Sequence, residues 1–254
     1  MLVVCNGAAK SGSTWLYNIV SNIADFRWPD SQFLSKSNTK HPTIKEIQLG
    51  AFLKTEGFQS QNFISKNHYG KEQHRALLLS SPYTRIFDMC RDTRDVIVSS
   101  YYDECRRNGF SGSFGDYYWQ TGRLLVESIG RYHKVWEGPH PQIFVTSYEA
   151  LKTEFDDEVR KIGFFLGTEV GDEDLARIDE ASNINSLRQS YKDDAQYNTR
   201  NNPFFRKGEI GDWKNHFDTK MVNDYEEIER NGIGKFDPIY LRTRIRQKLH
   251  RIFQ

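Results

Sequence analysis

The stretch Leu2–Trp15, LVVCNGAAKSGSTW, decides the fold of this 254-residue chain. It opens with a short apolar run that ends at Gly7, which predicts a buried strand. A glycine-rich turn follows, and apolar residues at helical spacing then predict a helix over Ser13–Asp25, capped by Ser13 or Thr14. A strand, a glycine-rich turn and a helix form a phosphate cradle, because main-chain N–H groups and the positive helix end attract an anion there.

The lysine of this turn lies earlier than in the triphosphate-binding loop GxxxxGK[ST], where it directly follows the second glycine. Gly7 and Gly12 keep the spacing of that loop, but Ser13 follows the second glycine and the lysine is Lys10. A lysine inside the loop reaches a different atom of the ligand. The alternatives from this segment alone are a turn with a surface lysine and a P-loop kinase, for which Asp88 is the one candidate Mg²⁺ ligand.

Further along the chain, strand-like and helix-like patterns alternate. The patterns predict strands at 85–90 and 142–146 and helices at about 96–106, 114–137 and 148–166. The last helix should end at Gly167, and the polar, aperiodic residues 189–202 should form a loop. Strands that alternate with helices imply a parallel sheet covered on both faces. The predicted fold class is therefore α/β, with a P-loop-like central parallel β-sheet flanked by helices in a single domain over residues 1–254.

The composition is that of a globular protein with nearly balanced charge. Hydrophobic residues make up 37% and charged residues 27%, and the net charge is +1. A nucleic-acid-binding domain would be strongly basic, so no nucleic-acid partner is expected, and any field that attracts a substrate must come from a local cluster. Three cysteines, Cys5, Cys90 and Cys105, are too few and too scattered for a disulfide framework or a zinc site.

Neither end of the chain predicts a membrane span. The start, MLVVCNG, has no basic region and no apolar region of signal-peptide length, and no later stretch approaches about 20 apolar residues. A cytoplasmic location without a membrane partner is expected. Residues 241–253 place apolar side chains on one helical face and basic ones elsewhere, which predicts a helix packed on its own domain, with an interfacial membrane helix as the alternative.

The segment KSGSTW resembles the loop with which cytosolic sulfotransferases bind 3′-phosphoadenosine 5′-phosphosulfate (PAPS), usually written PKSGTTW. The resemblance implies that the lysine contacts the bridging oxygen of the departing group and that the Ser, Gly and Thr groups hold the 5′-phosphate. The tryptophan would stack on adenine. The residues so implied are Lys10, Ser11, Gly12, Ser13, Thr14 and Trp15.

Two further segments resemble the 3′-phosphate motifs of the same family. RDTRDVIVSSYY, residues 91–102, implies Arg91 and Ser99 as ligands, and arginine suits a phosphate because it offers paired donors. FFRKGEIGDWKNHF, residues 204–217, resembles the C-terminal signature RKGxxGDWKN. It implies a loop folded over the nucleotide, with the ligands Arg206, Lys207 and Gly208.

A fourth segment concerns the adenine. TSYEALKTEFDDEVRKIGFFLG, residues 146–167, resembles the family's YEDLK…I..FLG element and implies Tyr148 on the adenine side. Ser182, in ASNINSL, corresponds by the same resemblance to a serine at the adenine edge.

A general base is expected because an acceptor hydroxyl or amine is a poor nucleophile while it keeps its proton. Histidine suits this role near neutral pH, and the chain has seven histidines. FISKNHYG, residues 63–70, resembles the family's KTHLP element, with Tyr69-Gly70 in place of Leu-Pro. It implies His68 as the base and Lys66 facing the sulfuryl oxygens. His68 follows an apolar run, so we expect it at the carboxyl end of a strand, where open α/β sheets bind ligands.

The resemblance implies a PAPS-dependent sulfotransferase, which releases 3′-phosphoadenosine 5′-phosphate (PAP). The acceptor would be a hydroxyl, amine or amide nitrogen of a small molecule, such as a secondary metabolite, attacked in line without a metal. The alternatives are a P-loop kinase-like phosphotransferase and a carbohydrate sulfotransferase. A non-catalytic nucleotide-binding module is another, but it could lose Lys10 and His68, and both are present.

Two features set this chain apart from other members of the family, and one aromatic cluster falls near a family helix. The segment where members often dimerise, KxxxTVxxxE, here has Asp218 for threonine and Lys220 for the apolar partner, which predicts a monomer or a dimer through another interface. The leader that animal enzymes carry before the first strand is absent, which predicts a small bacterial-type enzyme with a more open pocket. Tyr117, Tyr118 and Trp119 fall near the acceptor-facing helix, and core packing is expected for at least two of them.

Overall fold

Four parallel strands form the main sheet, in the order β2-β1-β3-β4. They are β1 (Leu2–Gly7), β2 (Phe63–Lys66), β3 (Thr84–Cys90) and β4 (Ile143–Ser147). Because β1 lies between β2 and β3, the chain changes its winding direction beside β1. Open α/β sheets bind ligands outside the carboxyl ends of their strands at such a point.

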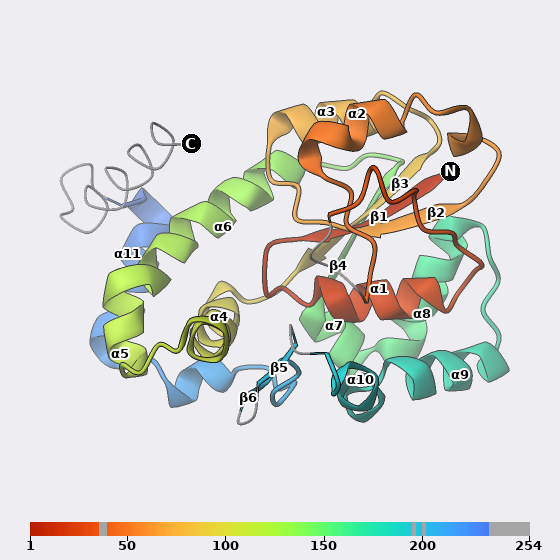
Figure 1. The fold of residues 1–254 in the computed structure, drawn as a ribbon. Helices are drawn as coiled ribbons and strands as arrows, with labels where there is room; N and C mark the ends of the chain where they lie inside the picture. The colour runs from red at the N-terminus through yellow and green to blue at the C-terminus, as the bar shows by residue number, and fades with distance from the viewer. Residues whose placement is uncertain (36–39, 195–196, 200–201, 234–254) are drawn as a thin grey trace. The chain divides into compact units, whose positions relative to one another are not determined.

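Helices cover both faces of this sheet, with α1 and α8 on one face and α2 and α3 on the other (Figure 1). The predicted α/β class with a parallel sheet is confirmed. The helices are α1 (Ser13–Ser21), α2 (Leu49–Phe52), α3 (Glu72–Leu79), α4 (Thr93–Asn108), α5 (Phe114–Tyr117), α6 (Arg123–Trp136), α7 (Tyr148–Thr153), α8 (Phe155–Leu166), α9 (Asp172–Ser182), α10 (Ile184–Tyr191) and α11 (Thr219–Asn231). Short helical turns lie at Glu46–Gln48, Glu56–Phe58, Tyr118–Gly122 and Asp212–Asn215, and β5 (Asn198–Thr199) pairs with β6 (Asn202–Pro203).

The structure, a computed structural model, describes residues 1–35, 40–194, 197–199 and 202–233. The predicted amphipathic helix over 241–253 lies outside the described residues. Within the described ranges, no helix is long and apolar enough to cross a membrane. The chain divides into a first unit, Met1–Asp92 with Tyr132–Ile210, and a second unit, Thr93–Arg131 with Gly211–Gln254.

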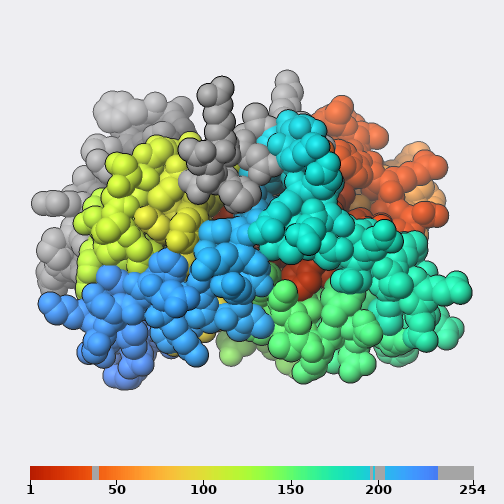
Figure 2. Space-filling model, turned by 90° about the horizontal axis from the view of Figure 1, so that it is seen from below, coloured from red at the N-terminus to blue at the C-terminus, as the bar shows by residue number. Residues whose placement is uncertain are grey.

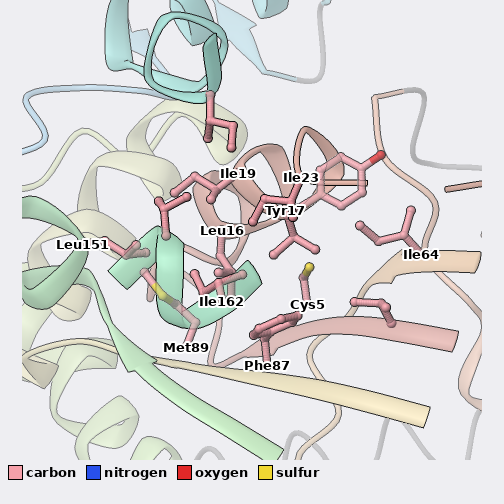
Figure 3. Packing of buried hydrophobic residues seen from close by; sticks show 14 of the residues in the cluster. Cys5, Leu16, Tyr17, Ile19, Ile23, Ile64, Phe87, Met89, Leu151 and Ile162 are labelled. Atoms are coloured by element: carbon pink, nitrogen blue, oxygen red, sulfur yellow. The ribbon is translucent and has the colours of Figure 1, made fainter. Parts of the chain in front are cut away.

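The core of the first unit fixes α1 against the sheet. Cys5 of β1 and Phe87 and Met89 of β3 point toward Leu16 and Ile19 of α1 (Figure 3). All are buried, and burial of one such apolar side chain contributes about 1.5–3 kcal/mol. This packing holds the helix and the strand on either side of the glycine-rich turn.

In the second unit, α4, α5, α11 and the part of α6 up to Arg131 share a core. Its members include Ile97, Tyr117, Tyr118 and Met221. Tyr117 and Tyr118 are buried there, as core packing predicts, and Trp119 packs against the cluster. The predicted helix over 114–137 is interrupted by one π-helical turn at Tyr118–Gly122.

Three details of the predicted elements are wrong. Helix α1 has Gly12 as its cap residue, and no side chain caps it, because Ser13 and Thr14 already lie inside the helix. The predicted helix over 148–166 breaks at Glu154, where φ is −133° and ψ is 42°. The predicted loop over 189–202 contains the end of α10 and the β5–β6 pair. The stop at Gly167, in the left-handed conformation, is confirmed.

Candidate active site

The turn between β1 and α1 has a backbone that suits glycine at one place and strains lysine at another. Lys10 has φ of 71° and Gly12 has φ of 104°, a region that side chains with a Cβ rarely adopt. A Cβ at Gly12 would lie 2.8 Å from Cδ2 of Tyr148 and 2.9 Å from Cε of Met89. The turn therefore passes so close to its neighbours that only glycine fits at this position.

The same turn holds a buried hydroxyl that lacks a partner. Ser11 is 1% exposed, and its Oγ has no hydrogen-bond partner among the described residues. Leaving a buried polar group unsatisfied costs about 1–3 kcal/mol. Because no side chain caps the first N–H groups of α1 either, the turn offers several donors to an anion. Ser13 and Thr14, at the start of that helix, are also buried.

His68 follows the end of β2 and faces this turn. Its Nδ1 lies 2.7 Å from the carbonyl oxygen of Gly7, and its Nε2 lies 2.9 Å from Nζ of Lys66. A carbonyl oxygen only accepts and an ammonium only donates, so Nδ1 carries the proton and Nε2 keeps its lone pair. The imidazole is therefore a neutral base with a defined tautomer.

Desolvation by the surrounding protein, and after it the ammonium of Lys66, lower the pKa of His68 below its ordinary value near 6.5. The side chain keeps an exposed face, so water moderates the desolvation, and the close ammonium is the firmer reason for the direction. His68 is neutral at pH 7 for both reasons.

Tyr148, at the start of α7, lies at the centre of the site. Its ring meets Trp15 edge to face at a centroid distance of 5.2 Å, and the guanidinium carbon of Arg91 lies 4.1 Å from its centroid. Trp15 also stacks on Phe155 at 6.5 Å. Helix α1, the residue that follows β3, and α7 are thus joined by one aromatic ring.

Arg91 directly follows β3 and has donor capacity left over. Its Nη2 donates to the carbonyl oxygen of Glu209 at 3.2 Å, while its buried Nε has no partner among the described residues. A buried arginine donor without an acceptor favours the binding of an anion, because the anion would accept its hydrogen bond. The bond to Glu209 also ties Arg91 to the loop that carries Arg206 and Lys207.

That loop reaches back to Tyr148. Gly208 has φ of 72°, and a Cβ there would lie 2.9 Å from Cδ1 of Ile184 and 3.2 Å from the hydroxyl oxygen of Tyr148. Arg188 of α10 holds the loop by donating to the carbonyl oxygens of Phe205, at 2.8 Å, and of Arg206. Figure 2 shows a red patch of the N-terminal segment between the green segment and the cyan segment that leads into this loop.

The sequence reasoning missed one aromatic partner of the loop and the role of Arg188. Nζ of Lys10 lies 4.0 Å from the ring centroid of Phe204. The two phenylalanines before RKG were the available signal, because an aromatic pair directly precedes the basic residues of the signature. Lys207 pairs with Glu209 at 3.6 Å.

Two residues that the family resemblance implies as nucleotide ligands have no described contact with the site residues above. Ser182 is fully buried, and its hydroxyl donates to the carbonyl oxygen of Ile178 at 2.7 Å, a bond within its own helix. Ser99 lies half-buried on α4, in the second unit. Their roles stay predictions.

The rest of the RDTRD segment has a structural role in the second unit. The buried carboxylate of Asp95 accepts from the main-chain N–H groups of Gly211, at 2.7 Å, and Trp213, at 2.9 Å. The guanidinium carbon of Arg94 lies 3.7 Å from the ring centroid of Trp213. These contacts hold the GDW part of the C-terminal signature, which sequence reasoning had read only as part of a nucleotide loop.

Cations of the first unit gather at the carboxyl ends of its strands. These cations form the kind of local charge cluster that we expect if a field attracts the substrate. They are Lys10, Lys66, Arg91, Arg206 and Lys207. Within the described ranges, no three His, Cys, Asp or Glu side chains come close enough to hold a metal ion. Such a site can bind a doubly phosphorylated ligand and place it beside a neutral histidine.

Comparison with known proteins identifies the family to which this chain belongs. The family model of the sulfotransferase domain matches residues 3–250. Sulfotransferase 1E1 of Bos taurus is 26% identical over 252 residues, which cover 93% of this chain and 84% of the relative. Cytosolic sulfotransferase 1 of Arabidopsis thaliana is 25% identical over 248 residues, which cover 86% and 74%.

Solved structures share the fold. Mouse sulfotransferase SULT7A1 complexed with PAP superposes with a TM-score of 0.65 at 19% identity, covering 98% of this chain and 88% of that one. Retinol dehydratase in complex with androsterone and the inactive cofactor PAP gives 0.64 at 18% identity, covering 93% and 81%. The chain belongs to the sulfotransferase family. The predicted enzyme class, a PAPS-dependent sulfotransferase, is confirmed.

Proposed function

We propose that this sulfotransferase moves the sulfuryl group of PAPS onto a hydroxyl, amine or amide nitrogen of a small molecule, with His68 as the general base. One observation carries the proposal. The Gly7 carbonyl of the phosphate turn fixes the His68 tautomer, so the lone pair of Nε2 belongs to the same turn as Lys10. The proposed PAPS-binding turn and the proposed base are therefore held by the same segment of main chain.

The residues present fit PAPS. The orphaned hydroxyl of Ser11 and the uncapped N–H groups of α1 supply donors for the 5′-phosphate, with Ser13 and Thr14 beside them. Arg91, whose Nε lacks a partner among the described residues, would hold the 3′-phosphate with Arg206 and Lys207. We assign Gly208 and Ser99 to the same phosphate, and Trp15, Tyr148 and Ser182 to the adenine side. When bound, PAPS supplies the activated sulfuryl group and a phosphate leaving group.

His68 would take the proton of the acceptor as the new bond to sulfur forms. At neutral pH it is uncharged, and its Nδ1–H stays bonded to Gly7 while Nε2 accepts. Lys66 now donates to Nε2, so it must turn toward the sulfuryl oxygens when His68 accepts the acceptor's proton. Such a positioned base contributes typically 10²- to 10⁴-fold.

Lys10 would stabilise the negative charge that develops on the bridging oxygen. A fixed cation lowers the barrier most where charge grows in the transition state. Lys10 has a left-handed backbone conformation, at φ of 71°, and its Nζ lies over the ring of Phe204. The strain at this residue is consistent with a functional constraint on its position.

The small-molecule acceptor, the location and the absence of a metal belong to the proposal. Retinol dehydratase binds androsterone and retinol in its solved complexes, which supports a hydroxyl-bearing acceptor of that size. The Arabidopsis relative is named cytosolic, which supports a cytoplasmic location. We propose a monomer, or a dimer through a surface other than residues 214–226, and transfer without a metal.

Isothermal calorimetry with PAP and with adenosine 5′-phosphate, both in EDTA, tests the donor site. PAP should bind at least ten times more tightly, because Arg91, Arg206 and Lys207 lose their partner when the 3′-phosphate is missing. PAP should also raise the melting temperature by mass action. Equal affinities would overturn the 3′-phosphate assignment, and binding that needs Mg²⁺ would favour a kinase.

The kinase alternative has a weaker basis in the structure. Its candidate Mg²⁺ ligand, Asp88, is buried and already accepts from the hydroxyl of Tyr132 at 2.7 Å. The family match favours sulfuryl transfer over phosphoryl transfer.

A further inference from the structure

The residue after His68 is held by a buried side chain that no nucleotide motif contains. Asn6 of β1 is fully buried. The main-chain N–H of Tyr69 donates to its Oδ1 at 2.8 Å, and its Nδ2 donates to the carbonyl oxygen of Tyr69 at 3.2 Å. Nε1 of Trp136 donates to the same carbonyl oxygen at 2.6 Å. Both main-chain groups of Tyr69 are therefore fixed.

These bonds continue the sheet beyond the end of β2. The β1–β2 register ends at the pair Cys5 and Lys66. One residue further, the N–H of Asn67 still donates to the carbonyl oxygen of Cys5 at 3.1 Å. At Tyr69 the side-chain amide of Asn6 makes the hydrogen bonds that the main chain of a neighbouring strand would make. His68 lies between Asn67 and Tyr69, which are both held in this way, and its Nδ1 bonds to Gly7. The amide of Asn6 prolongs the ladder that aims the imidazole.

Two further residues fix the orientation of the Asn6 amide. Its Nδ2 also donates to the hydroxyl of Tyr132 at 2.6 Å, and that hydroxyl donates to Oδ1 of Asp88 at 2.7 Å. Both hydrogens of Nδ2 are thus used, one for Tyr69 and one for Tyr132. The direction of these bonds follows from Asn6, because an amide N–H only donates, so the Tyr132 hydroxyl accepts from it and donates its own proton to Asp88.

Tyr132 also packs where the related family element carries proline. A Cβ at Gly70 would lie 3.0 Å from Cδ2 of the Tyr132 ring. The sequence Tyr69-Gly70 lacks the proline ring that restricts the backbone in the family element, so neighbouring side chains must restrict it. Asn6, Tyr132 and Trp136 are the neighbours that supply it.

We propose that Asn6, oriented by Tyr132 and Asp88, is the residue that positions His68: it holds the Tyr69 peptide so that the imidazole donates from Nδ1 to Gly7 and presents Nε2. The inference rests on the proposed function only in calling His68 the base. The predicted tautomer and its dependence on Asn6 hold whatever chemistry follows.

The direct test is the ¹⁵N NMR spectrum of the His68 imidazole, assigned by its loss in His68→Gln. Wild-type protein should show the neutral tautomer protonated on Nδ1. Asn6→Leu, close in shape but without donors or acceptors, should show a mixture of tautomers. An unchanged tautomer in folded Asn6→Leu would overturn the proposal. If Asn6→Leu does not fold, Tyr132→Phe replaces it with a smaller shift expected, and an unchanged spectrum in that variant is equally decisive.

The matched control is Gln142→Leu, which removes another amide that binds main chain. Nε2 of Gln142 donates to the carbonyl oxygens of Ser81, at 2.6 Å, and Thr84, at 3.2 Å, at the opposite end of β3. Its loss should lower the melting temperature without changing the His68 spectrum. A tautomer change in this control as large as in Asn6→Leu would mean that any loss of stability disturbs His68, which would also overturn the proposal.

A double-mutant cycle separates this proposal from the proposed function, with PAPS and 2-naphthol as the probe reaction. Asn6→Leu should keep PAP affinity within about threefold and lower kcat roughly tenfold or more, and it should cause no further loss in His68→Ala, where no base remains to be positioned. An equal loss of kcat in the wild type and in His68→Ala would mean that Asn6 has only a structural role. Wild-type turnover in His68→Ala would instead remove the base while leaving the NMR result intact.

Discussion

Individual residues carry the chemistry, and His68 is the first to test. His68→Ala should lower kcat by at least roughly 10²-fold, because a positioned base is lost. PAP affinity should stay nearly unchanged, since the proposed base would face the acceptor and not the nucleotide. Initial rates with an acceptor found by mass-spectrometric screening measure the first effect, and calorimetry measures the second. His140→Ala, which removes a histidine bonded locally to Gln142, is the control and should retain full turnover.

Lys10 should behave differently, because we propose that it acts on both donor binding and the transition state. Lys10→Ala should weaken PAPS binding and lower kcat together. Lys10→Arg should restore only part of the activity, since a planar guanidinium does not replace a compact ammonium in a tight turn. The comparison of kcat and KM for the two variants checks this. Full activity in Lys10→Arg would contradict it.

Much of the site could be predicted at the scale of single residues, because short motifs keep their own spacing. Lys10, His68 and Arg91 all follow ends of parallel strands, so topology alone brings them to one edge of the sheet. The partners Phe204 and Asn6 could not be found that way. Their roles depend on contacts between distant segments, which no local pattern records.

Among the elements, the glycine turn allows a prediction with a matched control. Gly12→Ala should abolish measurable PAP binding or weaken it at least tenfold, because the new Cβ meets Tyr148 at 2.8 Å in a left-handed backbone. Gly130→Ala lies inside α6 with nothing within 4 Å of its Cβ, and should stabilise the protein by about 0.5–1 kcal/mol. Calorimetry and chemical unfolding of both variants check the pair.

Element boundaries were less predictable than element types. The break at Glu154 escaped detection because buried side chains continue at helical spacing across it, from Leu151 to Val159 and Ile162. The polar stretch after residue 189 looked like a loop because its two short strands carry no apolar alternation. Tyr191 and Tyr197 are nevertheless buried against each other there, at a centroid distance of 4.8 Å.

At the scale of the whole molecule, His41 predicts how stability depends on pH. It is 2% exposed, and its Nε2 lies 2.9 Å from the hydroxyl oxygen of Tyr197. Burial lowers its pKa to about 3, and the charge of Lys66 and the charge that His68 gains when it is protonated act in the same direction. The unfolded chain, with a pKa near 6.5, binds this proton first. Its contribution is therefore full above pH 6.5 and is lost as the pH falls toward 3, at no more than about 1.4 kcal/mol per pH unit.

Urea unfolding at pH 7 and pH 5 measures this dependence. The free energy of unfolding of the wild type should fall between these values, and His41→Phe should show a shallower fall, because phenylalanine takes no proton. An equally steep fall in His41→Phe would assign the dependence to other groups.

The ribosome synthesises the three residues of the contact between Gly12, Tyr148 and Gly208 in a fixed order. The turn with Gly12 is made first, Tyr148 later, and Gly208 only after all strands of the parallel sheet exist. A nascent chain on the ribosome can thus assemble its sheet while the loop that closes on Tyr148 is still missing. Closure across so long a chain carries its entropy cost at the final step. Because we propose that this loop closes over the nucleotide, a growing chain should gain its affinity for nucleotide only after the loop is made.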